Sequence, residues 1–145
     1  MVEWNLTETE WAYIAGLLDG EGVITVTKHR GRYRRSKTAQ YVPKVEISNT
    51  DRKVIDWLNS RINGVVWTSS RKKGWKKLYT WRLQRQEEIL DFLLNVLPYL
   101  IIKSGQAKLM IKLLTLRQPR RRKPWTKEEI EIVEEIKRLN IRGEV

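Results

Sequence analysis

The stretch YIAGLLDGEG, residues 13–22, places two carboxylates and two glycines where a predicted apolar helix ends. Ile14 and Leu18 lie about one helical turn apart, so we expect one side of this helix to be buried. A glycine within a helix costs roughly 1 kcal/mol relative to alanine, and carboxylates at a helix C-terminus oppose the helix dipole. Asp19 and Glu21 therefore require an explanation other than local helix stability.

The rest of the chain alternates between helical and strand-like patterns. Apolar residues at three- and four-residue spacing predict the helices, and alternating β-branched runs predict the strands. Thr7 with Glu10, and Thr126 with Glu129, form predicted capping boxes, and Asp51 is a predicted cap. The expected elements are helix 7–20, strands 22–28 and 40–48, helix 51–63, strands 65–71 and 78–84, helices 87–97 and 103–116, and helix 126–139. This order predicts an α+β fold with a four-stranded antiparallel sheet, one face covered by helices and the other solvated.

Composition divides the chain into three expected parts. The core is residues 1–116, a basic linker follows at 117–125, and a helical extension occupies 126–145. The linker contains RQPRRRKP, whose two prolines argue against regular structure. The helix of the extension is expected to pack on the core through the apolar side chains Ile130, Val133 and Ile136. Pro43, within a predicted strand, indicates a sheet edge or a bulge.

The chain is strongly basic, with a formal net charge of +12 from 29 Lys and Arg against 17 Asp and Glu. The charge is uneven, because residues 126–145 carry 4 basic and 6 acidic side chains and the remainder carries 25 and 11. A positive field of this size favours a polyanion, and nucleic acid is the leading partner class. No predicted helix is basic on one face and apolar on the other, so an anionic membrane is disfavoured.

Other features limit the class of protein. The sequence contains no cysteine, which excludes disulfides and thiolate metal sites. No apolar run is long enough to span a membrane, and the charged beginning does not resemble a signal peptide. We expect an intracellular protein, in a prokaryotic cytoplasm or an organelle, with no membrane partner and no small-molecule substrate.

The solvated face of the sheet is the expected DNA-reading surface, because basic runs lie in both hairpin turns. Strand alternation selects the side chains expected to contact bases, and the two turns supply those expected to contact phosphate. The base contacts are Thr25, Thr27, His29, Lys44, Glu46, Arg71, Thr80 and Arg82; the phosphate contacts are Arg30, Arg32, Arg34, Arg35, Lys72 and Lys73. Among the tryptophans, Trp67 and Trp81 are expected in the core.

The motif IAGLLDGEG, residues 14–22, at the start of this element order resembles the LAGLIDADG homing endonucleases. The resemblance covers roughly residues 7–116. It implies that the sheet forms a DNA-binding saddle. It also implies a site-specific DNA endonuclease that makes a staggered double-strand break in a long pseudo-palindromic site by metal-dependent phosphodiester hydrolysis.

The same resemblance assigns catalytic residues. Glu21 matches the family's metal-binding carboxylate, and the backbone carbonyl of Gly20 is a second candidate ligand. Lys103 matches a lysine that polarises water or stabilises charge, with an ordinary helix-start lysine as the alternative. Asn49 matches a polar side chain beside the water network, with Lys53 as a basic neighbour and helix capping as the alternative. The implied cofactor is Mg²⁺, for which Mn²⁺ or Ca²⁺ can substitute in binding; magnesium takes oxygen ligands and keeps several waters.

The family resemblance also implies a homodimer on double-stranded DNA, in which this helix packs against its copy. Ala15, Gly16 and Gly20 allow the close approach, and Asp19 is a helix-end or interface group. The principal alternative is a non-cleaving nucleic-acid binder of the same fold, either an RNA splicing maturase or a transcription regulator. A structural dimeric module with an incidental basic surface is a further alternative.

Overall fold

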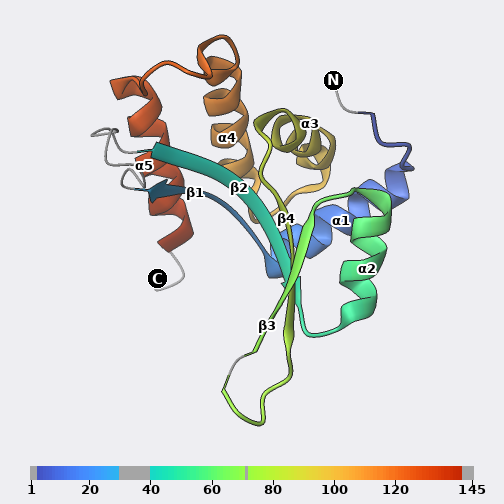
Figure 1. Cartoon of the computed structure of the whole chain (residues 1–145). Helices are drawn as coiled ribbons and strands as arrows, with labels where there is room; N and C mark the ends of the chain where they lie inside the picture. Colours follow the sequence, from blue (N-terminus) through green and yellow to red (C-terminus); the bar gives the residue numbers. More distant parts are fainter. Residues whose placement is uncertain (1–2, 30–39, 71, 142–145) are drawn as a thin grey trace.

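The computed structural model describes residues 3–29, 40–70 and 72–141, and its elements follow the predicted order (Figure 1). The helices and strands are α1 (Glu8–Glu21), β1 (Gly22–His29), β2 (Gln40–Asn49), α2 (Arg52–Arg61), β3 (Val65–Ser69), β4 (Leu78–Leu83), α3 (Gln86–Val96), η1 (Leu97–Tyr99), α4 (Ser104–Arg117), η2 (Gln118–Arg120) and α5 (Lys127–Ile141). Within the described part of the chain, no helix has the length and apolar character that a membrane span requires.

The four strands form one antiparallel sheet in the order β1-β2-β4-β3, as predicted. β2 pairs with β1 along residues 40–47 but with β4 only along residues 45–49. Pro43 therefore lies where β2 has a neighbour on one side only, and its missing N–H interrupts no pairing with β4. The predicted edge position of Pro43 is confirmed locally, although β2 as a whole is a central strand.

One face of the sheet is covered by helices and carries the hydrophobic core (Figure 1). Ile24, Val26, Val45, Ile47 and Trp81 belong to this face, and none is more than 1% exposed. The alternate residues of β2 stay partly exposed on the opposite face. This is the period-two pattern that a half-solvated antiparallel sheet requires.

Helix α5 shares this core. Val133 and Ile136 are fully buried as predicted, and Ile132 is buried beside them, whereas Ile130 is only partly buried. α5 lies against α4 and β1, and Asn140 Nδ2 donates to the carbonyl oxygen of Ile24 in β1 at 2.9 Å. The extension is therefore attached to the first strand of the sheet by both apolar and polar contacts.

Capping side chains begin three of the helices where the sequence predicts them. The Glu10 backbone N–H donates to Thr7 Oγ1 at 3.2 Å, and the Thr7 N–H donates to Glu10 Oε1 at 3.0 Å. Thr126 and Glu129 make the same reciprocal pair before α5, at 3.1 and 2.7 Å. Asp51 accepts from the Lys53 N–H and caps α2. These bonds satisfy backbone donors that the first turn of a helix leaves without partners.

The expectation that RQPRRRKP lacks regular structure is wrong for its first half. Arg117 is the last residue of α4, and Gln118–Arg120 forms a 3-10 turn that continues from it. Proline is tolerated there because the first turn of a helix needs no N–H from it.

Candidate active site and nucleic-acid interface

Asp19, the first of the two carboxylates at the end of α1, has its partners within the chain. Its side chain accepts hydrogen bonds from three consecutive backbone N–H groups, those of Ile101, Ile102 and Lys103, at 2.8, 3.1 and 2.9 Å. Lys103 is the N-cap residue of α4, so the carboxylate occupies the favourable end of that helix's dipole. Asp19 thus fastens the start of α4 to the end of α1.

Lys103 is drawn to the same place by its side chain. Its Nζ donates to the backbone carbonyl oxygen of Asp19 at 2.6 Å. This carbonyl lies in the last turn of α1, where the helix itself supplies no partner. The ammonium group of Lys103 is therefore held at the C-terminal end of α1, although 84 residues separate Lys103 from Asp19.

Glu21, the second carboxylate at the end of α1, is exposed at the surface. Asn49, at the end of β2, donates from Nδ2 to Glu21 Oε2 at 2.5 Å. The Asn49 Oδ1 accepts from the Asp51 backbone N–H at 2.7 Å, in the turn that leads to α2. Asn49 therefore helps to form the turn before α2, although Asp51 is the N-cap residue, and it orients Glu21.

Three segments distant in the sequence thus meet at one point: the end of α1, the end of β2 and the start of α4. They bring together an exposed carboxylate, an amide and an ammonium group. Lys53, the fourth predicted catalytic residue, is not joined to them by its side chain within the described residues; only its backbone N–H has a recorded contact there, with Asp51.

A divalent metal would find only oxygen donors here. Among the described residues, no three His, Cys, Asp or Glu side chains gather at one point. One chain offers the Glu21 carboxylate and, since α1 ends at that residue, the Gly20 carbonyl that the helix leaves unpaired. Such a donor set fits magnesium or calcium, which keep waters and take further oxygens from a phosphate. It does not fit a zinc site, which requires nitrogen or sulfur ligands.

Solved structures with this architecture were found by comparison. The homing endonuclease I-CvuI, crystallised with a DNA target in the presence of magnesium, has a TM-score of 0.74 and 16% identity over 95% of this chain and 86% of its own. The archaeal intron-encoded homing endonuclease I-Vdi141I, complexed with DNA, has a TM-score of 0.70 and 14% identity over 94% of this chain and 87% of its own. The LAGLIDADG homing endonuclease I-SmaMI, bound to cleaved DNA, has a TM-score of 0.68 and 20% identity over 94% of this chain and 44% of its own.

The chain has the LAGLIDADG homing endonuclease fold. At these identities the likeness shows the fold. No protein-family model and no curated protein matches the sequence. The predicted α+β class and the family resemblance of the fold are both confirmed.

In this LAGLIDADG fold, α1 has an exposed side that contains two glycines. A Cβ built at Gly16 or Gly20 meets no other atom within 4 Å, so packing within the chain does not require glycine at either position. Tyr13, on the same side, is 49% exposed. Ala15, by contrast, is fully buried in the chain's own core, so its assignment to a dimer interface is wrong. The side-chain oxygens of Asp19 are used within the chain, as expected of a helix-end group, and the alternative of an interface role stays a prediction.

The solvated face of the sheet carries most of the predicted base contacts that the structure describes. The register places Thr25 opposite Lys44, and Glu46 opposite Arg82, all on this face. Arg82 donates from Nε to Glu46 Oε1 at 2.7 Å, and Lys44 Nζ lies 3.3 Å from the same oxygen. One carboxylate is therefore shared by two cations, and the guanidinium of Arg82 is fixed in orientation.

Two predictions for this face need correction. Trp67 was expected in the core, but it pairs with Thr80 on the solvated face, and the Arg82 guanidinium lies 4.5 Å from its ring centroid. Thr80 is on the predicted face but is only 4% exposed, and its hydroxyl is hydrogen-bonded to Ser48 at 2.8 Å. Thr80 is therefore withdrawn from the residues available to bases. The burial of Trp81 is confirmed.

The remaining predicted contacts lie in or beside the turns. Lys72 and Lys73 are exposed in the turn between β3 and β4, where Trp75 is 57% exposed. Arg30, Arg32, Arg34, Arg35 and Arg71 lie outside the described residues, and so does the side chain of His29.

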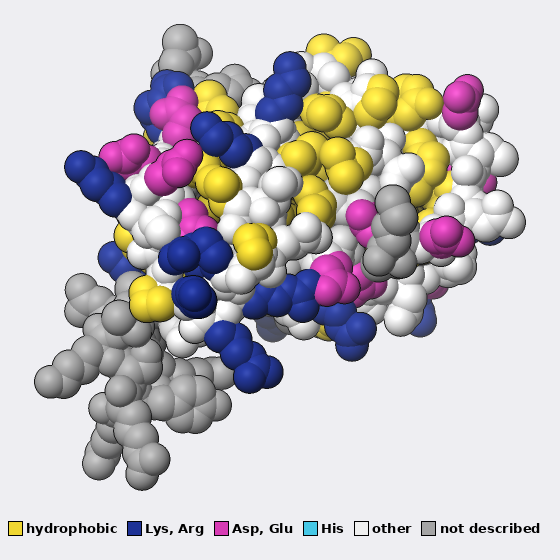
Figure 2. All heavy atoms as spheres, turned by 90° about the horizontal axis from the view of Figure 1, so that it is seen from above, with side chains coloured by type: hydrophobic (Ala, Val, Ile, Leu, Met, Phe, Trp, Pro, Cys, Tyr) yellow, Lys and Arg dark blue, Asp and Glu magenta, His cyan; other side chains and the backbone are white. Residues whose placement is uncertain are grey.

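The helical side of the molecule has a different character. Figure 2 shows acidic, basic and hydrophobic side chains intermingled on the end that bears the helices. The basic excess of the chain is therefore not gathered into one continuous surface there. The sequence reading missed Trp67 and Ser48 on the solvated face and the anchoring role of Asp19. Strand alternation could have assigned Trp67 and Ser48, whereas only the tertiary structure shows the partners of Asp19.

Proposed function

We propose that the chain is one half of a homodimeric, metal-dependent endonuclease that cuts a long pseudo-palindromic site in double-stranded DNA. One observation carries the proposal: an exposed Glu21, oriented by Asn49 and accompanied by the Lys103 ammonium, stands at the end of the glycine-bearing helix. The fold adds support, because I-CvuI, I-Vdi141I and I-SmaMI are homing endonucleases solved with DNA.

Each of the three residues has a distinct task. The Glu21 carboxylate, with the Gly20 carbonyl, would hold Mg²⁺, and Mn²⁺ or Ca²⁺ could replace it in binding. A metal ion held by these residues would supply an activated water and would shield the charge that develops during cleavage. Asn49 keeps the carboxylate in one orientation. Lys103 places a fixed positive charge beside the scissile phosphate, where charge increases in the transition state.

DNA would lie along the solvated face of the sheet. Thr25, Thr27, Lys44, Glu46 and Arg82 face it and would contact base edges. Glu46 accepts from the Nε and Nη2 of Arg82, which leaves Nη1 for DNA. Arginine donors favour the O6 and N7 acceptors of guanine, so Arg82 would select guanine at one position.

The loops would supply contacts that do not depend on sequence. Lys72 and Lys73 project from the turn between β3 and β4, and lysine binds phosphate as a point charge. The basic residues of the first hairpin turn, and Arg71, remain proposals of the same kind, as does base contact by His29. Lys53 remains a proposal for the water network.

A second copy of the chain is needed because one copy offers a single carboxylate. Gly16 and Gly20 would let two α1 helices approach closely, which gives a purpose to glycines that the chain's own packing does not use. Ile101 and Ile102, 85% and 55% exposed, lie beside the end of α1 through their bonds to Asp19 and extend the apolar surface available to the partner. Two copies related by a two-fold axis would each cut one strand, at staggered positions across the minor groove.

Selection from a randomised duplex library tests the activity. Wild-type protein in magnesium should cut a recoverable set of pseudo-palindromic sites, and a chelator should stop the reaction. Glu21→Gln should retain binding to those sites without cutting them. Binding without cleavage by the wild type, in magnesium and in manganese, would favour the non-cleaving alternative.

Sedimentation tests the dimer separately. Gly16→Leu should force the helices apart and shift the protein on its selected DNA from dimer to monomer, with loss of cleavage. Lys112→Leu adds the same side chain to the exposed surface of α4 and serves as the matched control. A wild-type monomer on cleaved DNA would contradict the dimer.

A further inference from the structure

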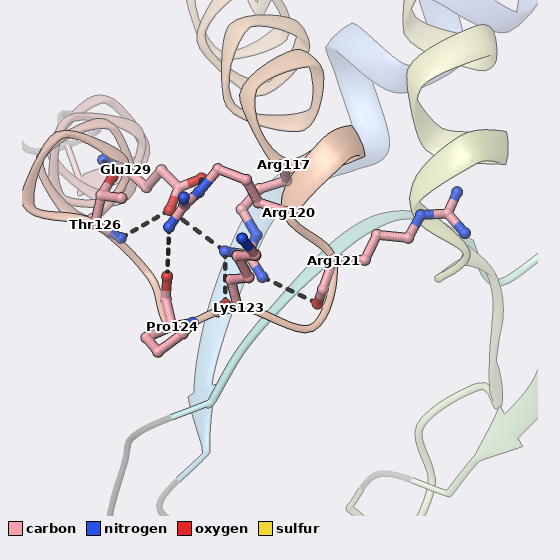
Figure 3. A network of polar contacts seen from close by, with 7 residues as sticks. All are labelled: Arg117, Arg120, Arg121, Lys123, Pro124, Thr126 and Glu129. Atoms are coloured by element: carbon pink, nitrogen blue, oxygen red, sulfur yellow. Dashed lines mark hydrogen bonds and ion pairs between the residues drawn. The ribbon is translucent and has the colours of Figure 1, made fainter.

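At the turn between α4 and α5, the side chains of Arg117 and Arg120 make their polar contacts within the turn and with Glu129 (Figure 3). Arg117 is 2% exposed. Its guanidinium carbon lies 4.3 Å from the ring centroid of Trp125. Its Nη1 donates to the carbonyl oxygen of Lys123 at 3.1 Å and contacts Glu129 Oε1 at 3.4 Å, and Nη2 donates to the carbonyl oxygen of Arg121 at 3.1 Å. Arg117 therefore holds the turn closed from inside.

This group carries more positive than negative charge: Arg117 and Glu129 are buried, and the Arg120 side chain beside them is 36% exposed. Arg120 donates from Nη2 to the Pro124 carbonyl, and its Nε lies 4.0 Å from Glu129 Oε2. Two guanidinium groups thus share a single carboxylate that is 1% exposed. The Nε atoms of Arg117 and Arg120 are buried and have no hydrogen-bond partner among the described residues. The excess positive charge belongs to the partly exposed Arg120, and an opposite charge near it would balance the group.

A cavity of about 500 Å³ adjoins this group. Arg121 also lines it, but its charge is offset by an ion pair with Glu87 of α3. Within the described chain, no acidic side chain lines the cavity, and the side chains of Arg122 and Lys123 have no partner. The lining residues are Gln40, Tyr41, Arg117, Arg121, Arg122, Lys123, Pro124, Trp125 and Ile130. Cationic walls of low dielectric concentrate a positive potential, so the ligand class is an anion.

Position in the fold indicates the source of the anion. The cavity lies at Gln40, where β2 begins, whereas Asn49 beside Glu21 is where β2 ends. A ten-residue strand spans about 30 Å. That length corresponds to about nine nucleotides of one B-DNA strand at 3.4 Å each. Measured along β2, the cavity is thus about as far from Asn49 and Glu21 as the outer part of a DNA half-site would be.

We propose that this cavity binds a backbone phosphate of the target duplex, about nine nucleotides from the scissile phosphate. Arg122 and Lys123 contact the phosphate, while the excess charge of Arg117 and Arg120 acts on it from beneath. The inference rests on the proposed function, since it requires duplex DNA that runs along the solvated face and past the Gln40 end of β2, where the cavity lies beside Tyr41 on the helix-covered side. On this proposal the cavity binds the outer part of the DNA half-site and does not contribute to base-sequence recognition.

Neutral backbone substitution tests the position. In the selected target, single methylphosphonates replace the phosphates one at a time, and binding is measured in calcium. The wild type should lose about tenfold or more in affinity when a phosphate about nine nucleotides from the cut is neutralised. The R122Q/K123Q double variant should bind more weakly and no longer respond at that phosphate. K108Q/K112Q removes two exposed charges from α4 and should behave as the wild type.

Salt dependence on a random-sequence duplex supplies a test that needs no target. The logarithmic salt slope should fall by about two in R122Q/K123Q and stay unchanged in K108Q/K112Q. An unchanged slope in the first variant, or no sensitive phosphate near the ninth position, would overturn the inference while leaving cleavage intact. Stabilisation of the wild type by inorganic phosphate alone, lost in R122Q/K123Q without any effect on DNA, would also overturn it and assign the cavity to a free phosphate compound. Failure of the proposed function would appear separately, as a protein that selects no cleaved site.

Discussion

The end of α1 and the turn between α4 and α5 are both dense in charge, yet they distribute that charge in opposite ways. At the end of α1, Asp19 is engaged by three backbone N–H groups, and Glu21 remains at the surface with one amide partner. In the turn, Arg117 is buried and Arg121 is paired with Glu87. A charged side chain whose hydrogen-bonding atoms are directed into the chain builds the site, whereas one that keeps atoms at the surface can act on a ligand.

The comparison separates residues that build a site from residues that act in it. Asp19 and Arg117 have their hydrogen-bonding atoms directed at the chain itself, so replacing them should change stability first. Glu21 and Lys123 have atoms directed at solvent, so replacing them should change activity or binding first. The substitutions below test this division.

Replacing Glu21 should have the largest effect of all. Glu21→Gln keeps the shape of the side chain and its neighbour Asn49 but removes the charge. We expect cleavage to fall by about 10³-fold or more, a loss on the scale of a key electrostatic contact in the transition state. Binding to the selected DNA should stay the same or improve slightly, because a negative charge near phosphate is gone. Single-turnover cleavage and equilibrium binding measure the two effects, and full cleavage in magnesium would refute the mechanism.

Arg117→Leu should cause the largest loss of stability. It leaves Glu129 buried with a single, more distant cation, Arg120 at 4.0 Å. Breaking a buried ion pair from one side costs about 3–5 kcal/mol. Chemical denaturation should show this loss, and the double variant Arg117→Leu with Glu129→Leu should recover part of it. A single variant as stable as the wild type would show that the buried charge is not what closes the turn.

Asp19→Asn should affect both cleavage and stability, with a smaller effect on cleavage than Glu21→Gln and a smaller effect on stability than Arg117→Leu. The neutral side chain accepts more weakly from the N–H groups of residues 101–103, and hydrogen bonds to a charged group are worth about 1.5–3 kcal/mol. The start of α4 should loosen, and Lys103 should lose its fixed position. A lowered Tm together with slower cleavage at unchanged metal affinity is the expected result. Loss of metal binding instead would make Asp19 a ligand and would remove the contrast with Glu21.

Arg82 and Glu46 extend the comparison to the sheet face. Arg82→Ala should relax base preference at one position by about 1–3 kcal/mol. Glu46→Gln should weaken the same preference less, since Arg82 keeps its charge and its contact with Trp67. Binding to a panel of single-base variants of the selected site measures both. Equal weakening on every sequence would place Arg82 among the phosphate contacts.

The smallest expected effect is a loss of stability at acid pH, caused by protonation of Glu10 at the beginning of α1. The Thr7 backbone N–H, followed by the Arg61 guanidinium, holds the pKa of Glu10 below its usual value of 4.5. Because the pKa is lowered in the folded protein, the stabilisation is present above pH 4.5 and is lost as the pH falls through the folded value. Glu10→Gln should therefore lower the Tm at pH 7, and the difference in Tm from the wild type should shrink as the pH falls below 4.5. Parallel curves would show that the capping box does not depend on the charge.

Much of the fold follows from local sequence patterns. Strand alternation placed Lys44, Glu46 and Arg82 on the solvated face, and Thr7 with Glu10 marked the beginning of α1. These features depend on neighbours within a few residues, which is the range over which periodicity and capping act.

The sequence was less informative wherever the partner was remote. The resemblance selected Glu21, Asn49 and Lys103, but no local pattern shows that Asp19 binds residues 101–103, more than eighty positions away. Ala15 and Gly16 look alike as small residues, yet a rotation of one position along the helix places one in the core and the other at the surface. No local pattern shows that Arg117 and Arg121 of the linker are paired, because their partners Glu129 and Glu87 lie in other elements.

The contact between Asn140 and Ile24 has a consequence for how the protein is made. It joins residues 116 positions apart, and α5 as a whole packs on the first strand. During synthesis, β1 emerges early, and although α1 and α4 also contact it, its inner face stays incompletely covered until α5 has left the ribosome. Contacts of such long sequence separation slow folding and leave strand edges open to aggregation in the meantime. Newly made chains should therefore depend on chaperones until α5 closes over β1.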